Sequence, residues 1–510
     1  MYLKQGLVAL LALGPVSAAW ALPATDEGAT RLKGVFQTYF GGVDGVVTVT
    51  PKGETYDLVI DPAPLLAQIP GDSGLKVEIG ALTYQLTDNG DGSWGVTENQ
   101  TLSMSISVPG VMDQIASTKI ESSGIWDEAL PGFREQKSVM TGYTVNSTQY
   151  MPAGLPQGLQ PNDAAPEAAP DAPTAQPQVM SRDSSSTDRF ETNLTAKAAA
   201  AGGVDHEITY RAEGLNQTMD YADMGGMGPM HFEMTSPGYD GTAKIMGARN
   251  DGILGLTAWL VAHPSQELIA GSQDGLRDKL SAAMPLWDDI TADMVLRDLK
   301  VVTPFGEFGA AEVGGEFGLS GVEGEGRFRE MVNITGLTVP EAIIPPWALP
   351  VVPQEVSFDF TASDFNLAAP AKMIIEGFDL TLMDPMVNVD PDALQTAFFA
   401  GSPVALALAP SHIKGDGYEI GYEGAMQAGP DAPPSGSAKI TASGLDKIEA
   451  ALNAAPPEQA QQPLMMLQMA KMLGKAGASG ELVWEIDATD PNGAILVNGQ
   501  QVAGGTPPQQ

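Results

Sequence analysis

Residues 81–96 read ALTYQLTDNGDGSWGV and carry the clearest structural signal in the chain. Apolar and polar residues alternate over 82–86, and the alternation resumes at Trp94 after the turn-forming run DNGDG at 88–92. A period of two predicts a β-strand with one buried face, and an Asn-Gly or Asp-Gly turn between two such runs predicts a hairpin. We therefore expect two antiparallel strands here.

The same alternation extends over most of the chain, with a few helical segments between the strands. The 58 Gly and 39 Pro residues are typical of many short strands and turns. Pro391 directly follows Asp390, a helix cap and first-turn pair. The sequence predicts an α+β, mainly β fold of extended, twisted antiparallel sheets with a few packed helices.

The expected elements of the two halves are as follows. In the first half we expect a helix at 30–39 and strands at 43–50, 55–60, 75–86, 101–108 and 142–150. In the second half we expect strands at 189–196, 206–212, 295–303, 311–319, 326–337, 356–362, 373–382, 402–408, 418–425, 437–442, 480–487 and 494–502. Helices are expected there at 266–284, 391–399, 445–452 and 463–473.

Charge and residue usage exclude several function classes. The chain has 63 Asp and Glu against 26 Lys and Arg, a net charge of −37. Such a charge repels nucleic acid and anionic lipid headgroups, so no nucleic-acid partner is expected. The absence of cysteine excludes disulfides, thiol nucleophiles and Cys-ligated metals.

The N-terminal residues have the layout of a secretory signal peptide. Lys4 precedes an apolar run at 6–13, Gly14 and Pro15 follow it, and Ala19-Trp20-Ala21 offers small residues at the cleavage positions. We expect removal of 1–21 and a periplasmic protein. No later segment reaches the length of a transmembrane helix, so no transmembrane segment is expected after cleavage.

Composition predicts two domains in the mature chain. Pro and Ala dominate 152–177, and 181–188 is polar and serine-rich. Neither composition buries a core, so 151–188 is expected to be an extended linker. This divides a β-rich domain at 22–150 from a second β-rich domain with helices at 189–503, followed by a disordered tail at 504–510.

A methionine-rich segment is the strongest candidate metal site. Thioether and imidazole groups are soft ligands that suit Cu(I), and the neighbouring glycines would let a loop close around an ion. Methionine is also a common filler of apolar gaps, which is the alternative reading. The candidate copper ligands are Met219, Met224, Met227, Met230, His231 and Met234.

Two other motifs fail on spacing or context. From Asp88 or Asn89 the run does not place Gly and Glu where an EF-hand loop needs them, so a hairpin turn is preferred. The run 411–414 (SHIK) matches S-x-x-K, but it follows an apolar strand-like stretch and no K-T-G occurs. The sequence therefore predicts no catalytic residue and no cofactor.

The signal peptide, the hairpin at 82–96, the Pro- and Ala-rich middle, and the segments 358–382 and 437–452 together resemble the envelope family catalogued as domain of unknown function 2125. The ending at 480–502, with Val497-Asn498-Gly499, is similar to related periplasmic proteins. The resemblance implies an exported, β-rich protein distantly similar to elongated lipid-handling proteins of the Gram-negative envelope. It assigns no functional residue.

Two functions of different class remain open. The first is a non-enzymatic cell-envelope protein that binds an apolar ligand, a lipid or an envelope partner on a curved sheet. The proline-rich apolar segment 339–353 would border that groove, or form a buried crossover loop. The second is a periplasmic enzyme or copper-handling protein that uses the segment 219–234.

Overall fold

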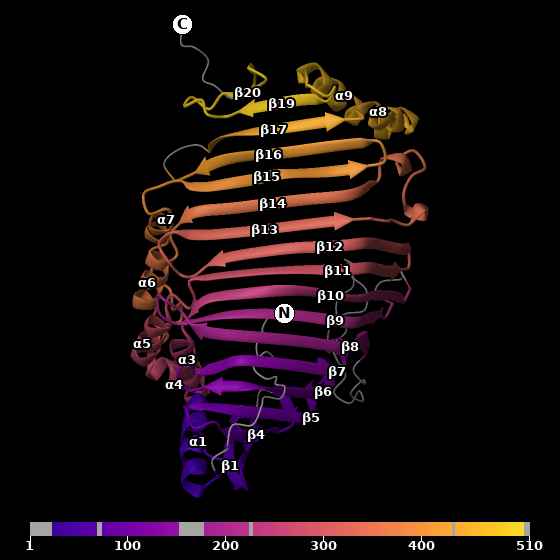
Figure 1. Ribbon diagram of the computed structural model, residues 1–510. Coiled ribbons are helices and arrows are strands. Elements are labelled where there is room, and N and C mark those ends of the chain that lie inside the picture. Colours follow the sequence, from indigo (N-terminus) through magenta and orange to yellow (C-terminus); the bar gives the residue numbers. More distant parts are fainter. Residues whose placement is uncertain (1–22, 69–73, 152–177, 224–227, 431–433, 504–510) are drawn as a thin grey trace, which may run out of the picture.

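The computed structural model describes residues 23–68, 74–151, 178–223, 228–430 and 434–503 (Figure 1). These residues form one 21-stranded sheet in which every pairing is antiparallel, with helices at the strand ends. The predicted α+β, mainly β class is confirmed, but the strands join into a single sheet. The predicted signal peptide and the C-terminal tail lie outside the described residues.

The strands have the following bounds: β1 Val47–Lys52, β2 Thr55–Ile60, β3 Lys76–Ile79, β4 Leu82–Asp88, β5 Ser93–Val108, β6 Met112–Asp127, β7 Gly132–Tyr150, β8 Val179–Ala198, β9 Val204–Tyr221, β10 Met230–Ala248, β11 Asp289–Thr303, β12 Gly306–Ser320, β13 Gly326–Thr335, β14 Pro353–Phe365, β15 Val404–Gly415, β16 Tyr418–Ala428, β17 Ser435–Ser443, β18 Lys475–Ala476, β19 Leu482–Asp487, β20 Ile495–Val497 and β21 Gln500–Ala503.

The helices are α1 Asp26–Tyr39, α2 Ala63–Leu66, α3 Asn250–Ala262, α4 Gln266–Gly271, α5 Gln273–Ala283, α6 Ala368–Gly377, α7 Pro391–Phe399, α8 Leu445–Ala454 and α9 Pro457–Leu473, with short 3-10 turns η2 Glu341–Ile343 and η3 Leu349–Val351.

Strands follow one another in the sheet almost in chain order. From β5 to β17 each strand pairs with the next, and the chain turns back at every strand end (Figure 1). The order continues to β19 at one end, and through β4 and β2 to β1 at the other. Most neighbouring strands of the sheet are therefore also consecutive in the chain, as the turn-rich sequence predicts.

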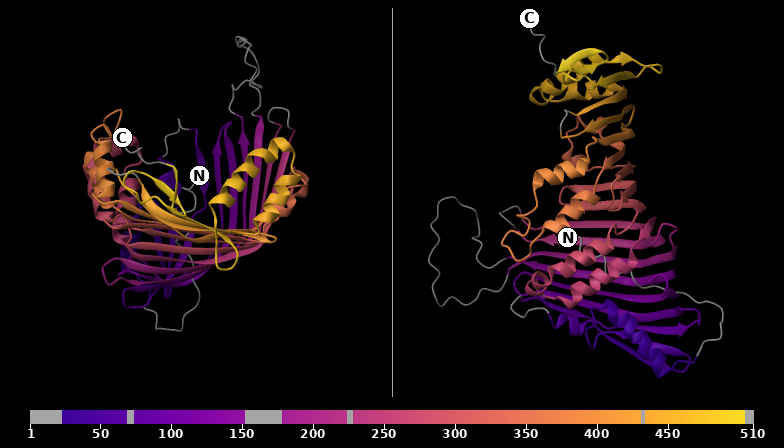
Figure 2. Two further views of the ribbon diagram at one scale, coloured as in Figure 1. Left: turned by 90° about the horizontal axis from the view of Figure 1, so that it is seen from above. Right: turned by 90° about the vertical axis from the view of Figure 1, so that its left-hand side faces the viewer.

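A transverse row of left-handed residues bends the long strands. Gly142 (φ 60°), Gly214 (φ 66°) and Asp298 (φ 44°) have positive φ inside strands β7, β9 and β11. The registers place Gly142 opposite Asp188, and Asp188 opposite Gly214. Along β11 the more buried positions change from even to odd numbers at Asp298. The register of β6 and β7 also shifts opposite Gly142, as at a β-bulge, and Figure 2 (left) shows strands curved into a trough.

Cross-strand pairing identifies the two faces of the sheet, because directly paired residues project from the same side. Met294 pairs with Gly315, Gly315 with Val332, and Val332 with Phe358. The same tracing places Trp94 of β5 and Trp484 of β19 on this side. We call it the inner face, and the opposite side the outer face.

Helices cover the inner face at both ends of the sheet. Phe36 of α1 lies 5.3 Å from Trp126 between ring centroids, and the Trp484 indole N–H donates to the carbonyl of Ala470 in α9 (2.8 Å). In Figure 2 (left) α8 and α9 lie on the hollow side of the curved sheet, so the inner face is the concave one. Helices α3 to α7 lie at one end of the strands (Figure 1).

Several expectations from the sequence are corrected. The expected helix 266–284 is two helices, α4 and α5, and the expected strand 494–502 is two strands, β20 and β21. The expected strand 373–382 is helix α6 and a turn, and the expected strand 75–86 is two strands that break at Gly80. The linker does not reach 188, because 179–188 belong to β8 and pair with β7. The two expected domains thus share one sheet. The methionine-rich segment continues as strand β10 rather than as a loop from Met230 onward.

These differences arise from contacts with distant parts of the chain, which the alternation of apolar and polar residues along one segment does not reveal. The apolar residues of 373–377 pack in a helix against α5, where Arg277 binds the helix carbonyls. The serine-rich residues of β8 bury little apolar surface, and they are held by a ladder to β7 on one side and β9 on the other. Backbone pairing between two long neighbours therefore overrides their low strand propensity.

Candidate functional site

The inner face of β11 to β16 is the candidate site, and we call it the open segment. Its partly exposed positions are almost all apolar, whereas Val404, Ser411 and Tyr418 on the same face are buried. Met294, Phe317, Phe358 and Met426 are each close to 40% exposed. The positions are Ile290, Ala292, Met294, Leu296, Val313, Gly315, Phe317, Leu319, Phe328, Glu330, Val332, Ile334, Val356, Phe358, Phe360, Ala362, Leu406, Leu408, Ile413, Ile420, Tyr422, Gly424 and Met426.

The open segment is long enough for an extended hydrocarbon chain. Six neighbouring strands are separated by five spacings of about 4.8 Å, or roughly 24 Å in all. One leaflet of a bilayer has a hydrocarbon thickness of about 15 Å, half that of the whole core. An acyl chain therefore fits lengthwise along the trough, and the contiguous apolar surface is larger than scattered surface residues would give.

At the N-terminal end the same face is closed by α1. Thr25 caps this helix by accepting from the Gly28 N–H (3.0 Å), and the helix buries Leu32 completely against the sheet. Trp94 and Leu58 beneath it are 1% and 2% exposed. This end is an ordinary hydrophobic core and contributes stability rather than a binding surface.

At the C-terminal end the face is covered by α8 and α9. Lys471 of α9 binds Asp446 and Glu449 of α8, which ties the two helices together. The apolar segment 339–353 contacts α8 through η3, and Tyr418 donates to the carbonyl of Val351 (2.8 Å). The segment is thus a crossover packed beside this end of the trough.

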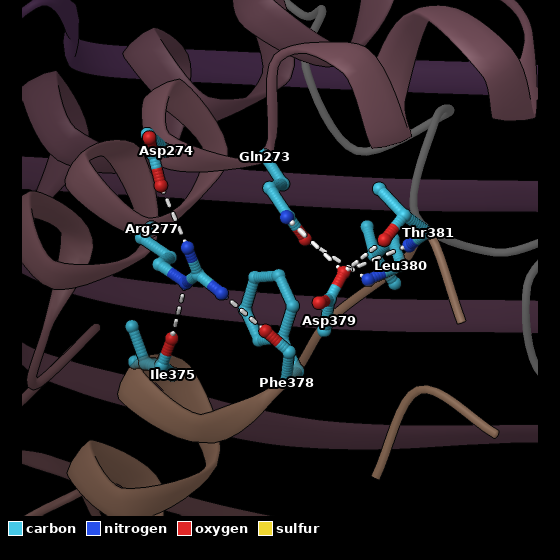
Figure 3. A network of polar contacts seen from close by, with 8 residues as sticks. All are labelled: Gln273, Asp274, Arg277, Ile375, Phe378, Asp379, Leu380 and Thr381. Carbon is cyan, nitrogen blue, oxygen red and sulfur yellow. Dashed lines mark hydrogen bonds and ion pairs between the residues drawn. The ribbon is translucent and has the colours of Figure 1, made fainter. Parts of the chain in front are cut away.

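A polar network joins the helices that border the trough on the other side (Figure 3). Arg277 of α5 donates to the carbonyls of Ile375 and Phe378 at the end of α6, and its guanidinium lies 4.9 Å from the Phe378 ring centre. Gln273 binds Asp379, whose carboxylate also accepts from Thr381. These hydrogen bonds lower the pKa of Asp379 below its ordinary value. The network fixes two segments that are about a hundred residues apart.

The outer face of β10 to β14 is mostly polar, and its Lys and Arg side chains form ion pairs. It contains a hollow of about 770 Å³ over β10 to β14, where Gly314 and Gly318 provide no side chains. The cations around it are neutralised, since Arg329 binds Glu316 and Asp359. Lys244 and Arg327 are likewise paired, with Glu207 and Asp289. The hollow therefore offers a ligand no unpaired cation among the described residues.

A buried carboxyl group lies on the inner face near the closed N-terminal end. Glu98 is 5% exposed and accepts from Ser122 (2.6 Å) and Gln100. Burial raises the pKa of this carboxyl, and the two hydrogen bonds oppose the rise. The neighbouring Tyr84 hydroxyl also has a raised pKa, first through burial and second through Glu98. No second carboxyl group is placed to form a catalytic pair with Glu98 in the interactions of the described residues.

The candidate copper ligands on β9 and β10 do not all lie on the same face of the sheet. Met219 pairs directly with Phe232, which shares its face with Met230 and Met234. His231 lies between them in sequence and so projects from the opposite face, where it binds Asp220 (2.7 Å). Met224 and Met227 lie outside the described residues. Among the described residues there is also no group of three or more His, Asp or Glu arranged to hold a metal ion.

The S-x-x-K residues are likewise separated. Ser411 lies on strand β15, where its hydroxyl donates to the Ala409 carbonyl (2.8 Å) and accepts from the Asp359 N–H (3.2 Å). Lys414 projects from the opposite face and binds Glu355. The residues 88–93 form the expected tight turn between β4 and β5.

Comparison with known proteins finds no relative of this chain. No family model matches the chain, and neither the curated proteins nor the solved structures include a match. Within the described ranges, no helix is long and apolar enough to cross a membrane.

Sequence reasoning did not find the open segment as a unit. Each strand could be predicted separately from its alternation of apolar and polar residues. Which apolar residues share one face of the sheet depends on how the strands pair. Glu330 was also missed, although it interrupts the apolar positions of β13, which read Phe328, Glu330, Val332 and Ile334. That interruption was a signal in the sequence, and the cross-strand partners were needed to interpret it.

Proposed function

We propose that this protein is a non-enzymatic, exported cell-envelope protein that binds the hydrocarbon chain of a lipid in its trough. The observation that carries the proposal is the open segment: a continuous apolar inner face, about 24 Å long by strand spacing, whose side chains are partly exposed. A soluble protein rarely leaves so much contiguous apolar surface in water, because each square ångström removed from water contributes about 25 cal/mol.

The ends of the sheet support a lipid chain rather than a second protein as the occupant. Helices α1 and α9 pack on the inner face at its ends, so a flat partner surface would have to pass between them. A flexible chain lies along a bent trough without such a conflict. The side chains of the open segment are aromatic, branched aliphatic and methionine, which together suit a chain of variable shape.

Export supplies the setting for this proposal. The signal-peptide layout at 1–21 and the resemblance to the envelope family favour a periplasmic site of action, and the acidic surface favours a protein that stays off anionic membranes. N-terminal sequencing of exported material is expected to begin at Leu22. An intact Met1 in the envelope fraction would contradict export through a cleaved signal.

Native mass spectrometry, followed by organic extraction of protein purified from its own envelope, tests the lipid proposal. We expect a bound lipid in stoichiometric amount, and its loss in the double variant F317S/F358S. The matched control is M246S, because Met246 is also 40% exposed but pairs with Asp289 on the outer face. Extraction of no lipid from the wild type would overturn the proposal, and stoichiometric copper would support the metal-handling alternative.

A further inference from the structure

Glu330 is the one charged residue at the inner-face positions of the open segment. It pairs directly with Phe317 on β12 and with Phe360 on β14, so both rings project from the same face beside it. Phe328 lies two residues away on the same strand and face. The carboxylate is thus bordered on three sides by phenyl rings.

The rings form a contiguous aromatic cluster. Phe317 and Phe328 are edge-to-face with centroids 5.8 Å apart, and Phe328 and Phe360 are 6.4 Å apart. Phe358 extends the cluster, with its ring stacked at 6.3 Å from Phe360. Phe317 is 40% exposed and Glu330 is also exposed, so a ligand can reach both the rings and the carboxylate.

The cations of the neighbouring strands lie on the opposite face. Arg327 and Arg329 flank Glu330 in sequence, so they project outward, where they bind Asp289 and Asp359. Lys414 is outward too, bound to Glu355. Among the described residues, no ion pair or hydrogen bond involves the Glu330 side chain, whose carboxylate therefore faces the trough unneutralised.

We propose that Glu330, Phe317, Phe328 and Phe360 form a binding site for a positively charged amine group of the bound lipid. An ammonium group over phenyl faces is attracted by the ring quadrupoles, and an adjacent carboxylate adds a direct ion pair. The hydrocarbon part of the same molecule lies along the apolar positions to either side. This inference rests on the proposed function, since it specifies which class of lipid the trough selects.

Three probes with the same twelve-carbon chain distinguish binding in the apolar trough from binding at the amine site. They are dodecyltrimethylammonium, dodecanol and dodecanoate, each titrated below its aggregation concentration against the full-length protein. The wild type is expected to bind the ammonium probe about tenfold more tightly than the alcohol, and the carboxylate probe most weakly. E330Q is expected to remove the preference for the ammonium while the alcohol binds as before.

The matched control removes an equal charge from the other face. Glu419 is exposed on the outer face of β16, so E419Q changes the overall charge by the same amount without touching the trough. F360L tests the rings, and it is expected to weaken the ammonium probe several-fold while leaving the alcohol unchanged. Equal losses in E330Q and E419Q would mean that the general negative field attracts the cation, and would overturn the inference.

The remaining outcomes distinguish this inference from the function on which it rests. Equal binding of all three probes by the wild type would overturn the amine site and leave the apolar trough intact. Binding of none of them would overturn the proposed function and the amine site together.

Discussion

Two stretches of the inner face, one under α1 and one along β11 to β16, have the same alternation of apolar and polar residues in sequence. They differ in how far their side chains are buried. Under α1 the sheet residues Trp94 and Leu58 are almost completely buried. In the open segment Phe317 and Phe358 occupy equivalent inner positions and remain about 40% exposed. The same alternation therefore forms a buried core in one region and a partly exposed apolar face in the other, according to whether the chain provides a covering helix.

The largest expected effect is on stability at the closed end. L32A removes a fully buried side chain between α1 and the sheet, and is expected to lower the free energy of unfolding by about 2–5 kcal/mol. In the open segment M294A removes a side chain that is 40% exposed, and is expected to cost less than about 1 kcal/mol. Denaturant titration of both variants measures the contrast. Equal losses would mean that the open segment is also covered.

The next effect concerns the polar network between α5 and the end of α6 in Figure 3. R277M keeps much of the side-chain length but removes the donors to the carbonyls of Ile375 and Phe378, so α6 is expected to exchange its amide hydrogens faster. The expected loss of global stability is about 1–2 kcal/mol, because two charge-assisted hydrogen bonds are broken at a partly exposed site. K279M on the same helix is the control. Unchanged exchange in α6 would show that the helices are held by packing alone.

The junction of the two expected domains gives a prediction about integrity. A specific protease site introduced within 152–177 would cut the chain between β7 and β8, which are paired along almost their full length. The two fragments are expected to remain together in gel filtration without denaturant. Separation into two independently folded pieces would restore the two-domain interpretation.

A smaller effect is expected from the pH dependence of the closed end. Because burial raises the pKa of Glu98 above its ordinary value of 4.5, the folded state binds its proton more tightly than the unfolded state does. The stabilisation from this group is fully present below that value and is lost as pH rises through the folded pKa. E98Q stays uncharged, so its stability relative to the wild type is expected to increase between pH 4 and pH 8.

Thermal unfolding of E98Q and of the wild type over this pH range measures the difference directly. E419Q provides the comparison, because it removes one carboxylate at a solvent-exposed position outside the closed end. A decrease in the relative stability of E98Q with rising pH would mean that the Glu98 carboxylate is stabilised by its surroundings.

Much of this fold could be predicted from local signals, and the site could not. The hairpin around the turn at 88–92 and the helix beginning at Pro391 were found from the sequence, because turn and cap chemistry act within a few residues. The strand at 179–188 was missed because its stability comes from two neighbouring strands. The aromatic surroundings of Glu330 depend on the registers of β12 and β14, which no local pattern contains.

A hydrocarbon chain bound in the trough would contact the inner face of β11 to β16, and photolabelling detects that contact. The most direct measurement loads the full-length protein with a long-chain alcohol that carries a photoactivatable group at its chain end, irradiates it, and maps the modified residues by peptide mass spectrometry. We expect modification at inner-face positions such as Met294, Phe317, Phe358 and Met426. Modification confined to the outer face, or to the exposed methionines of α9 at Met465 and Met472, would contradict binding in the trough.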